Sequence, residues 1–295
     1  MTRSTAGAGP DAVFRAACVQ MRATRDPLRN RDDAIRMIRE AATAGAQFVQ
    51  TPEVTNLCER DTKRMRELTQ TEEAHAVLAG LRETARDAKI WLHIGSLSVA
   101  DGEKIANRAY VIDPEGTIAA RYDKVHLFDV DLPNGETWRE SNTFTGGDRA
   151  VLVETPWGLV GLSICYDVRF PYLYRAEAEA GAFMLTGPAC FTRQTGEAHW
   201  QVLQRARAIE NGAFMMSAAQ GGLHEDGRES YGHSIIVDPW GRVLAEAGNE
   251  PGVVMAEIDT ALVAQARARV PSLRHGRSPR VTIARAERPR HDAAE

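Results

Sequence analysis

Apolar residues along the chain follow two rhythms: short runs bounded by turn residues, and longer segments with helical spacing. The short runs predict strands at Val13–Gln20, Phe48–Gln50, Ile90–Leu97, Val151–Glu154, Leu159–Ile164, Ala182–Leu185 and Ala213–Ala219. The helically spaced segments predict helices at Asp32–Ala44, Glu72–Lys89, Tyr172–Glu179 and Thr195–Asn211. This alternation of strands and helices favours an α/β fold whose helices lie outside its sheets.

Two segments far apart in the chain share one pattern, Tyr110–Ala119 and Ile235–Leu244. Each has two apolar stretches joined by Asp-Pro-x-Gly, and these residues at these positions favour a type I turn. One such hairpin in each half of the chain suggests two related sheets packed face to face. Because Asp-Pro-x-Gly is also a common hairpin turn, turn chemistry alone explains the similarity equally well.

The two ends of the chain differ in composition from the middle. Residues 1–11 hold one arginine followed by small polar residues and Gly-Pro, and residues 276–295 are charged and poor in apolar residues. Segments of this kind do not bury enough surface to order themselves. We therefore expect one domain over residues 12–275 between two tails, the C-terminal tail being available to pack on a neighbouring subunit.

Charge and hydropathy exclude several classes of partner. The 36 basic and 40 acidic residues give a net charge of −4, which offers no electrostatic reason to bind nucleic acid or an anionic membrane. No apolar run approaches the roughly 18 residues that a membrane span needs. The N-terminal residues lack the apolar segment of a secretory signal, so we expect a cytoplasmic protein.

Cys165 is the first candidate for chemistry. It ends the apolar run Leu159–Ile164 and is followed by polar and aromatic residues and by Pro171, where a sheet edge opens into a pocket. An ordinary cysteine has a pKa of about 8.5 and is only about 3% thiolate at pH 7, so a nucleophilic role requires a cation and a base from elsewhere. The alternative is a small buried hydrophobe. The chain has four cysteines, Cys18, Cys58, Cys165 and Cys190. They lack Cys-x-x-Cys spacing, which argues against a disulfide framework or a zinc knuckle.

Three distant segments contain groups of the required kinds. Glu53 follows Pro52 just past the strand Phe48–Gln50, and Pro52 ends the ladder so that Glu53 projects from the sheet. Lys124 lies directly after the first hairpin, and Glu140 follows a Pro-Asn-Gly loop. Taken singly, the three have ordinary roles as a surface cap, a solvated charge and a helix-start residue. Together they supply a base, a cation and a second carboxylate.

These segments resemble the nitrilase (carbon–nitrogen hydrolase) superfamily, from Ala17 to about Arg280. The motifs that carry the resemblance are Pro52-Glu53, Tyr122–Asp129, Arg139–Ser141, Ile164–Pro171, Gly196–Trp200, Arg205–Glu210 and Tyr231–Ser234 with Asp238–Gly241. The later motifs are most similar to the deaminated-glutathione amidase branch, and less similar to ω-amidases, which usually have tryptophan in place of Tyr231. The resemblance implies a four-layer α-β-β-α sandwich of two mixed sheets, in a homodimer or higher homo-oligomer.

The resemblance also implies a Glu–Lys–Cys triad of Glu53, Lys124 and Cys165, with Glu140 as an accessory carboxylate. Glu53 would act as general base and general acid by turns, and Cys165 would carry a thioester. Lys124 and the backbone N–H of Tyr166 would stabilise the oxyanion, and Glu140 would hold Lys124. The implied substrate is a small carboxylate-bearing amide, hydrolysed to acid and ammonia, and this chemistry requires neither cofactor nor metal.

The loop Ala189–Thr195 holds the candidates for substrate binding: Arg193, which can pair with a substrate carboxylate, and its neighbours Thr192 and Phe191. A solvated loop charge is the alternative interpretation of Arg193. Asp167 and Arg169 are expected to form an ion pair that shapes the turn after Cys165. Three histidines lie in motifs that look structural, and we interpret them as hydrogen-bonded scaffold: His126, His199 and His233.

The preferred amide stays open at this point, because the chain departs from the family's usual pattern. Thr51 precedes Pro-Glu where a bulky apolar residue is more usual, and Gly221-Gly222 replaces a cysteine-containing form. Other functions on the same scaffold are an ω-amidase, an aliphatic nitrilase, and an N-carbamoyl-amine hydrolase, which would also release carbon dioxide. A non-catalytic interaction protein is the alternative from a different class.

Overall fold

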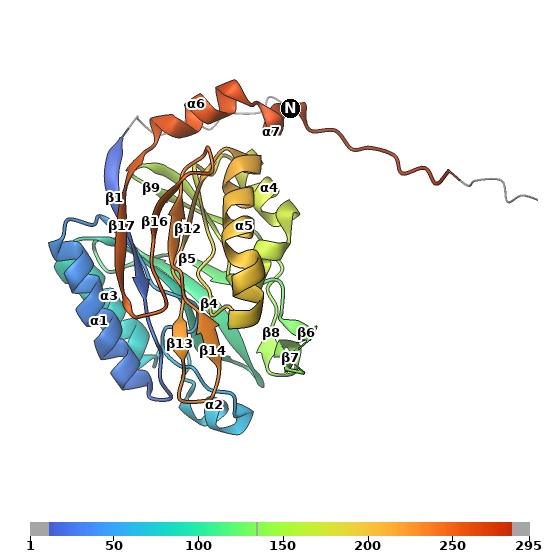
Figure 1. Cartoon of the computed structure of the whole chain (residues 1–295). Coiled ribbons are helices and arrows are strands. Elements are labelled where there is room, and N and C mark those ends of the chain that lie inside the picture. Colours follow the sequence, from blue (N-terminus) through green and yellow to red (C-terminus); the bar gives the residue numbers. More distant parts are fainter. Residues whose placement is uncertain (1–11, 134, 285–295) are drawn as a thin grey trace, which may run out of the picture.

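Two mixed β-sheets form the centre of the computed structural model, which describes residues 12–133 and 135–284 (Figure 1). The first sheet has the strand order β17 (Gly252–Asp259), β1 (Val13–Gln20), β2 (Phe48–Gln50), β3 (Trp91–Asp101), β4 (Lys104–Ile112) and β5 (Ile118–Asp123), with β8 (Phe144–Thr145) paired to β4. The second has the order β16 (Val243–Glu246), β15 (Ile235–Val237), β12 (Phe214–Ser217), β11 (Met184–Thr186), β10 (Gly158–Leu162) and β9 (Val151–Thr155). The central strands of each sheet are parallel, and the outer strands are antiparallel except for β8, which pairs parallel to β4.

Helices cover the outer faces of both sheets (Figure 1). Helices α1 (Pro27–Thr43) and α3 (Ala76–Ala88) pack on the first sheet, and α4 (Pro171–Glu179) and α5 (Arg193–Asn211) pack on the second. One apolar cluster joins α1 and α3 to the first sheet. The larger cluster joins the facing sides of the two sheets and includes Phe14 and Phe48 from the first sheet and Met184 and Phe214 from the second. The predicted four-layer α-β-β-α sandwich is confirmed.

Smaller elements lie at the two ends of the sandwich. Helix α2 (Thr62–Leu68) and the hairpin β13 (Gly221–Leu223) with β14 (Glu229–Tyr231) lie at one end, and α6 (Ala261–Arg269) and α7 (Ser272–His275) lie at the other (Figure 1). A second short hairpin pairs β6 (Asp129–Asp131) with β7 (Thr137–Arg139). Two turns of 3₁₀ helix, η1 (Glu140–Asn142) and η2 (Cys165–Arg169), complete the set.

Most predicted elements are present, and the differences lie at their ends. Strands β1 and β2 have the predicted bounds. Helix α1 begins at Pro27 rather than Asp32, because the Asp26 side chain accepts hydrogen bonds from the first free amides and Pro27 fits the first helical position. Helix α3 begins at Ala76 rather than Glu72, because His75 caps it and the Glu72 side chain instead binds Arg121.

Both predicted Asp-Pro-x-Gly hairpins form, one in each sheet. In the β4–β5 hairpin the amide of Gly116 donates to the carbonyl of Asp113, at 2.9 Å, and Gly116 has a φ of 80°. In the β15–β16 hairpin Gly241 donates to Asp238 over the same distance, with a φ of 86°. Positive φ is the conformation that glycine adopts without a steric penalty, so the fourth position of the motif is explained in both turns.

The structure describes only part of the two predicted tails. The predicted tail at residues 1–11 and the last part of the C-terminal tail, residues 285–295, lie outside the described residues. Residues 276–284 form no helix or strand and are exposed, including Val281 and Ile283. Among the described helices, none is both long enough and apolar enough to cross a bilayer.

Candidate active site

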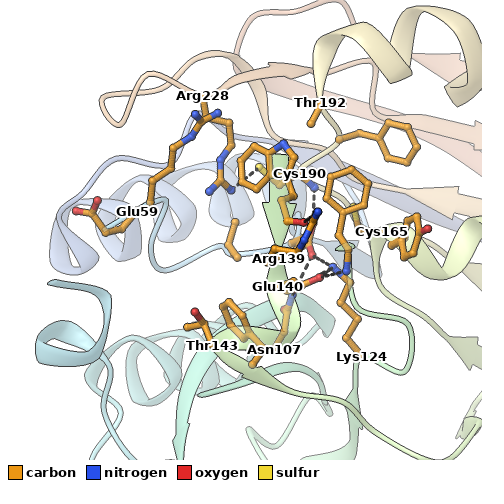
Figure 2. Close-up of a pocket in the computed structure, with 18 of the residues that line it drawn as sticks. Glu59, Asn107, Lys124, Arg139, Glu140, Thr143, Cys165, Cys190, Thr192 and Arg228 are labelled. Atoms are coloured by element: carbon orange, nitrogen blue, oxygen red, sulfur yellow. Dashed lines mark hydrogen bonds and ion pairs between the residues drawn. The ribbon is translucent and has the colours of Figure 1, made fainter. Parts of the chain in front are cut away.

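The four residues singled out by the sequence come together at the ends of strands from both sheets. Glu53 follows β2, Lys124 directly follows β5, and Glu140 begins η1 immediately after β7. Cys165 begins η2, three residues beyond the end of β10 in the facing sheet. Figure 2 shows the side chains of Lys124, Glu140 and Cys165 around one cavity. The sandwich therefore positions the group at one end of the contact between its two sheets.

Lys124 is the centre of a buried charge network. Its ammonium donates to Oε1 of Glu53 at 2.9 Å and to the two carboxylate oxygens of Glu140 at 3.0 and 2.9 Å. The side chain of Lys124 is only 3% exposed, and that of Glu53 is 5% exposed. The backbone N–H groups of Cys190 and Phe128 donate to Glu53 and Glu140, at 2.7 and 2.6 Å. Each carboxylate oxygen of Glu53 and Glu140 thus accepts a hydrogen bond, as buried charges require.

Asn107 belongs to this network, and sequence reasoning missed it. Its side-chain amide donates to Oε1 of Glu53 at 2.9 Å and to Oε1 of Glu140 at 3.2 Å. Asn107 lies within β4, between Ala106 and Arg108, and is 1% exposed. A polar amide inside a buried strand was the available sequence signal, because such a group is retained only where it has partners.

The electrostatics of the site favour a neutral thiol beside an ionised carboxylate. Burial alone would raise the pKa of Glu53, but the Lys124 ammonium, the Cys165 thiol and the Cys190 N–H together lower it below its ordinary value. Burial and the negative charge of Glu53 raise the pKa of Cys165 well above that of a free thiol. For Lys124, burial would lower the pKa, yet the two glutamates raise it. Glu53 is therefore ionised and able to accept a proton, and the protonated Cys165 thiol, which lines the same cavity, can supply it.

The backbone at Cys165 adopts an unusual conformation, with a φ of 50°. Such a left-handed conformation is uncommon for residues other than glycine and here places the thiol at the sharp turn between β10 and η2. The Cys165 amide donates to the carbonyl of Pro188 at 2.8 Å, which ties this turn to the loop after β11. The conformation turns the chain directly after the buried strand, so that the thiol reaches the cavity.

Asp167 holds the same turn, but not through the expected partner. Its carboxylate accepts from the Tyr122 hydroxyl at 2.7 Å, from the Ile164 amide at 2.9 Å and from the His126 amide at 3.0 Å. Within the part of the chain that the structure describes, no ion pair joins it to Arg169, so that prediction is wrong. Arg169 instead lies over the rings of Phe191 and Tyr166 and contacts His199.

The three histidines interpreted as scaffold make hydrogen bonds away from the cavity. His126 binds Asp167 through Nδ1 at 2.6 Å and stacks on Phe170. His199 contacts Arg169, and His233 contacts Glu246 through Nδ1 at 3.1 Å. None of the three is among the described residues that line the cavity.

The cavity has a volume of about 320 Å³ and an aromatic and cationic lining. Phe191 and Thr192 of the predicted binding loop line it, as does Tyr166. Arg193 does not line it among the described residues: it begins α5, and its guanidinium pairs at 2.9 Å with Glu197 and at 2.7 Å with Glu229 at the surface. The structure therefore does not bring Arg193 together with the other candidates.

Three other arginines line the cavity, Arg60, Arg139 and Arg228. Arg139 pairs with both oxygens of Asp131, and Arg60 pairs with Glu136. Arg228 comes from the β13–β14 hairpin, and its nearest carboxylate, on Asp226, is 3.6 Å away. Its Nε lacks a hydrogen-bond partner among the described residues. Trp138 contacts the guanidinium groups of both Arg60 and Arg228.

Known proteins are similar to this chain in both sequence and fold. The deaminated glutathione amidase of Synechocystis is 40% identical over 267 residues, covering 89% of this chain and 97% of that protein. The ω-amidase NIT2 of Homo sapiens is 38% identical over 265 residues, covering 90% of this chain and 95% of that protein. The crystal structure of the C. elegans NitFhit protein matches with a TM-score of 0.85 and 37% identity, over 90% of this chain and 66% of that longer chain.

A family model agrees with these individual matches. The model of the carbon–nitrogen hydrolase family matches residues 15–268. That range contains all four candidate residues and nearly all of both sheets. The chain belongs to the carbon–nitrogen hydrolase family and is a hydrolase that acts on carbon–nitrogen bonds other than peptide bonds.

Proposed function

We propose that this enzyme hydrolyses the amide of a small carboxylate-bearing substrate through a thioester on Cys165. The observation that carries the proposal is that Glu53, Lys124 and Cys165 line one cavity, in which the Lys124 ammonium lies 2.9 Å from the Glu53 carboxylate. A nucleophile, a base and a cation meet in one cavity, which is the set that acyl transfer requires.

In the first half of the reaction, the sulfur of Cys165 attacks the amide carbon while its proton passes to Glu53. The carbonyl electron pair moves onto oxygen, where the Lys124 ammonium and the backbone N–H of Tyr166 stabilise it. When the tetrahedral intermediate collapses, the carbon–nitrogen bond breaks and Glu53 returns the proton to the departing amine, which is ammonia for a primary amide. Cys165 is left as a thioester.

In the second half, Glu53 takes a proton from water, and the resulting hydroxide attacks the thioester carbon. The carbon–sulfur bond breaks, the acid leaves, and the sulfur regains a proton from Glu53. Glu140 keeps Lys124 in place through both of its carboxylate oxygens, at 3.0 and 2.9 Å. Phe191 and Thr192 form part of the wall that holds the acyl group.

Arg228, rather than the predicted Arg193, takes the role of carboxylate ligand. It lines the cavity, its Nε lacks a partner among the described residues, and its side chain is 14% exposed. A guanidinium that is largely shielded from water binds a carboxylate more strongly than one at the surface, such as Arg193. The names of the relatives, deaminated glutathione amidase and ω-amidase, fit an acidic substrate of this kind.

Steady-state hydrolysis of matched amides tests this function. We expect release of acid and amine from an amide that ends in a carboxylate, much weaker turnover of its neutral analogue, and no turnover by Cys165→Ala. Hydrolysis that survives in Cys165→Ala would refute the thioester route. Release of carbon dioxide in parallel with ammonia from N-carbamoyl amines, but none from amides, would favour the carbamoyl-amine hydrolase instead.

The proposal includes the assembly and the location expected from the sequence. We infer a single hydrolase domain over residues 12–275, in a cytoplasmic homodimer or higher homo-oligomer. The exposed apolar side chains of Val281 and Ile283 support packing of the C-terminal segment on a neighbouring subunit. Light scattering of the full chain and of a chain that ends at residue 275 tests this, since the shorter chain should form a smaller or weaker assembly.

A further inference from the structure

Besides Cys165, a pair of thiols lies at the cavity. The sulfur atoms of Cys58 and Cys190 and a ring nitrogen of His224 all lie within 4.8 Å of one another. Cys190 lines the cavity directly, whereas Cys58 is 1% exposed. The two cysteines come from the loop after β2 and the loop after β11, so the contact between the two sheets brings them together.

The surroundings of Cys190 favour its thiolate. The Cys58 thiol donates to Oδ2 of Asp226 at 3.9 Å, and its sulfur lies within 4.8 Å of the Cys190 sulfur. The guanidinium of Arg228 lies 3.6 Å from the Cys190 sulfur. The nearby Cys58 thiol and this positive charge lower the pKa of Cys190 below that of a free thiol, despite its burial. The nearby Cys190 sulfur and burial raise the pKa of Cys58. One thiol is thus activated and accessible, and the other is protonated and adjacent.

The same cluster is less suited to a metal ion. Nδ1 of His224 binds the carbonyl of Ala23 at 2.8 Å, and Nε2 binds the hydroxyl of Ser230 at 3.0 Å, so both ring nitrogens have partners. The Arg228 guanidinium already supplies positive charge to the Cys190 sulfur. A metal ion would have to displace Ser230 and lie beside this cation.

The geometry points to an oxidisable dithiol formed by Cys58 and Cys190, which a small hydroperoxide converts into a disulfide through the cavity. The Cys190 thiolate attacks the terminal peroxide oxygen, the oxygen–oxygen bond breaks, and Cys190 becomes a sulfenic acid while hydroxide or alkoxide leaves and takes up a proton. The Cys58 sulfur then attacks the sulfenic sulfur; the sulfur–sulfur bond forms, the sulfur–oxygen bond breaks, and water leaves with the Cys58 proton. Overall, two thiols and one hydroperoxide give one disulfide and water, plus water or an alcohol.

The disulfide would affect the reaction, because the Cys190 backbone N–H donates to Oε2 of Glu53 at 2.7 Å. The two sulfurs now lie within 4.8 Å, and a sulfur–sulfur bond of about 2.05 Å draws the Cys190 side chain towards Cys58, which strains its contacts with Arg228 and Ser230. This movement acts on the residue that holds the base, so we expect oxidation to lower amidase activity. The dithiol itself does not depend on the proposed substrate.

Peptide mapping of the full-length enzyme tests the dithiol. Trypsin places the four cysteines in four separate peptides: residues 16–22, 40–60, 150–169 and 176–193. After brief treatment with hydrogen peroxide at one equivalent per protein and alkylation of free thiols, we expect peptides 40–60 and 176–193 to be linked, and dithiothreitol to separate them. The 16–22 peptide holds Cys18, which is fully buried. Its thiol should react with the alkylating reagent only after the protein is unfolded, and it serves as the internal reference for a thiol that peroxide does not oxidise.

Two variants keep the result interpretable. In Cys165→Ala the linked peptide should still form, which separates this dithiol from oxidation of the proposed nucleophile. Cys58→Ser should keep the activity of the reduced enzyme but lose the linked peptide and the recovery of activity with dithiothreitol. A link between peptides 150–169 and 176–193, or oxidation of Cys165 alone, would overturn the proposal. Zinc that co-purifies and blocks alkylation of Cys58 and Cys190 until a chelator removes it would likewise overturn it, in favour of a metal centre.

Discussion

Replacement of Lys124 by methionine tests the charge network most severely. Methionine keeps the length and most of the volume of the side chain but removes the ammonium that contacts both Glu53 and Glu140. At an effective dielectric constant of about 20, each such contact contributes about 4 kcal/mol of attraction at 4 Å, opposed by the cost of desolvating the charges. Removing one partner of a buried pair typically costs about 3–5 kcal/mol of unfolding free energy, and we expect a loss in this range.

The pH dependence of this loss has a definite sign. In the wild-type enzyme the folded pKa of Glu53 is lowered, so its stabilising contribution is present above the unfolded pKa of about 4.3 and is lost as pH falls through the folded pKa. Without Lys124, burial dominates and raises the pKa of Glu53. The deficit of the variant relative to wild type should therefore grow as pH rises from about 5 to about 8.

Urea unfolding at these two pH values, together with ammonia release, measures both effects. We expect kcat/KM to fall at least about 10³-fold, because the cation near the oxyanion is lost and Glu53 no longer holds a negative charge at neutral pH. Lys63→Met, at an exposed position of α2, is the matched control and should change neither quantity. If Lys124→Met folds poorly, Lys124→Met with Glu140→Gln removes one stranded charge and should recover stability but not activity. A variant with wild-type stability and more than about a tenth of the activity would refute the reasoning.

Three further substitutions test individual contacts. Glu53→Gln keeps the shape but removes the base, so we expect kcat to fall about 10²–10⁴-fold in an ammonia assay; near-normal kcat would exclude Glu53 as the base. Arg228→Gln should raise KM for a carboxylate-bearing amide much more than for its neutral analogue, whereas Arg193→Gln should not; the reverse ranking would restore the interpretation made from the sequence. Asn107→Ala removes donors to two carboxylates and should lower the unfolding free energy by about 1.5–3 kcal/mol in urea titrations, a loss that a surface amide would not show.

Local patterns in the sequence predicted the layers of the fold well. Strands β1 and β2 have the predicted bounds, because their apolar runs are short and end at polar or turn residues. Strand β17 and helix α2 were not predicted: β17 owes its place to pairing with β1 along its whole length, which no local pattern reveals. Helix α1 begins earlier than its apolar spacing, because capping at Asp26 decides its first turn.

Some residues of the site could be predicted from the sequence around them, and others could not because contacts between distant segments bring them to the cavity. Glu53, Lys124, Glu140 and Cys165 were recognised because their motifs together resemble those of the carbon–nitrogen hydrolase family, whereas each motif taken singly has an ordinary explanation. Arg228 was missed because the β13–β14 hairpin carries it to the cavity, and nothing next to it in the sequence indicates that direction. The nearness of Cys58 to Cys190 was equally hidden, since two loops from different sheets create it.

The acyl-enzyme is tested most directly by the mass of the tryptic peptide 150–169 during turnover. The wild-type enzyme is mixed with a carboxylate-bearing amide, quenched with acid within the first turnovers, and then digested briefly with trypsin at neutral pH. We expect that the peptide containing Cys165 gains the mass of the acyl group, that hydroxylamine removes this mass, and that Cys165→Ser shows no thioester. Rapid hydrolysis with no acyl mass on Cys165 at any quench time, or with that mass on another residue, would contradict the central claim.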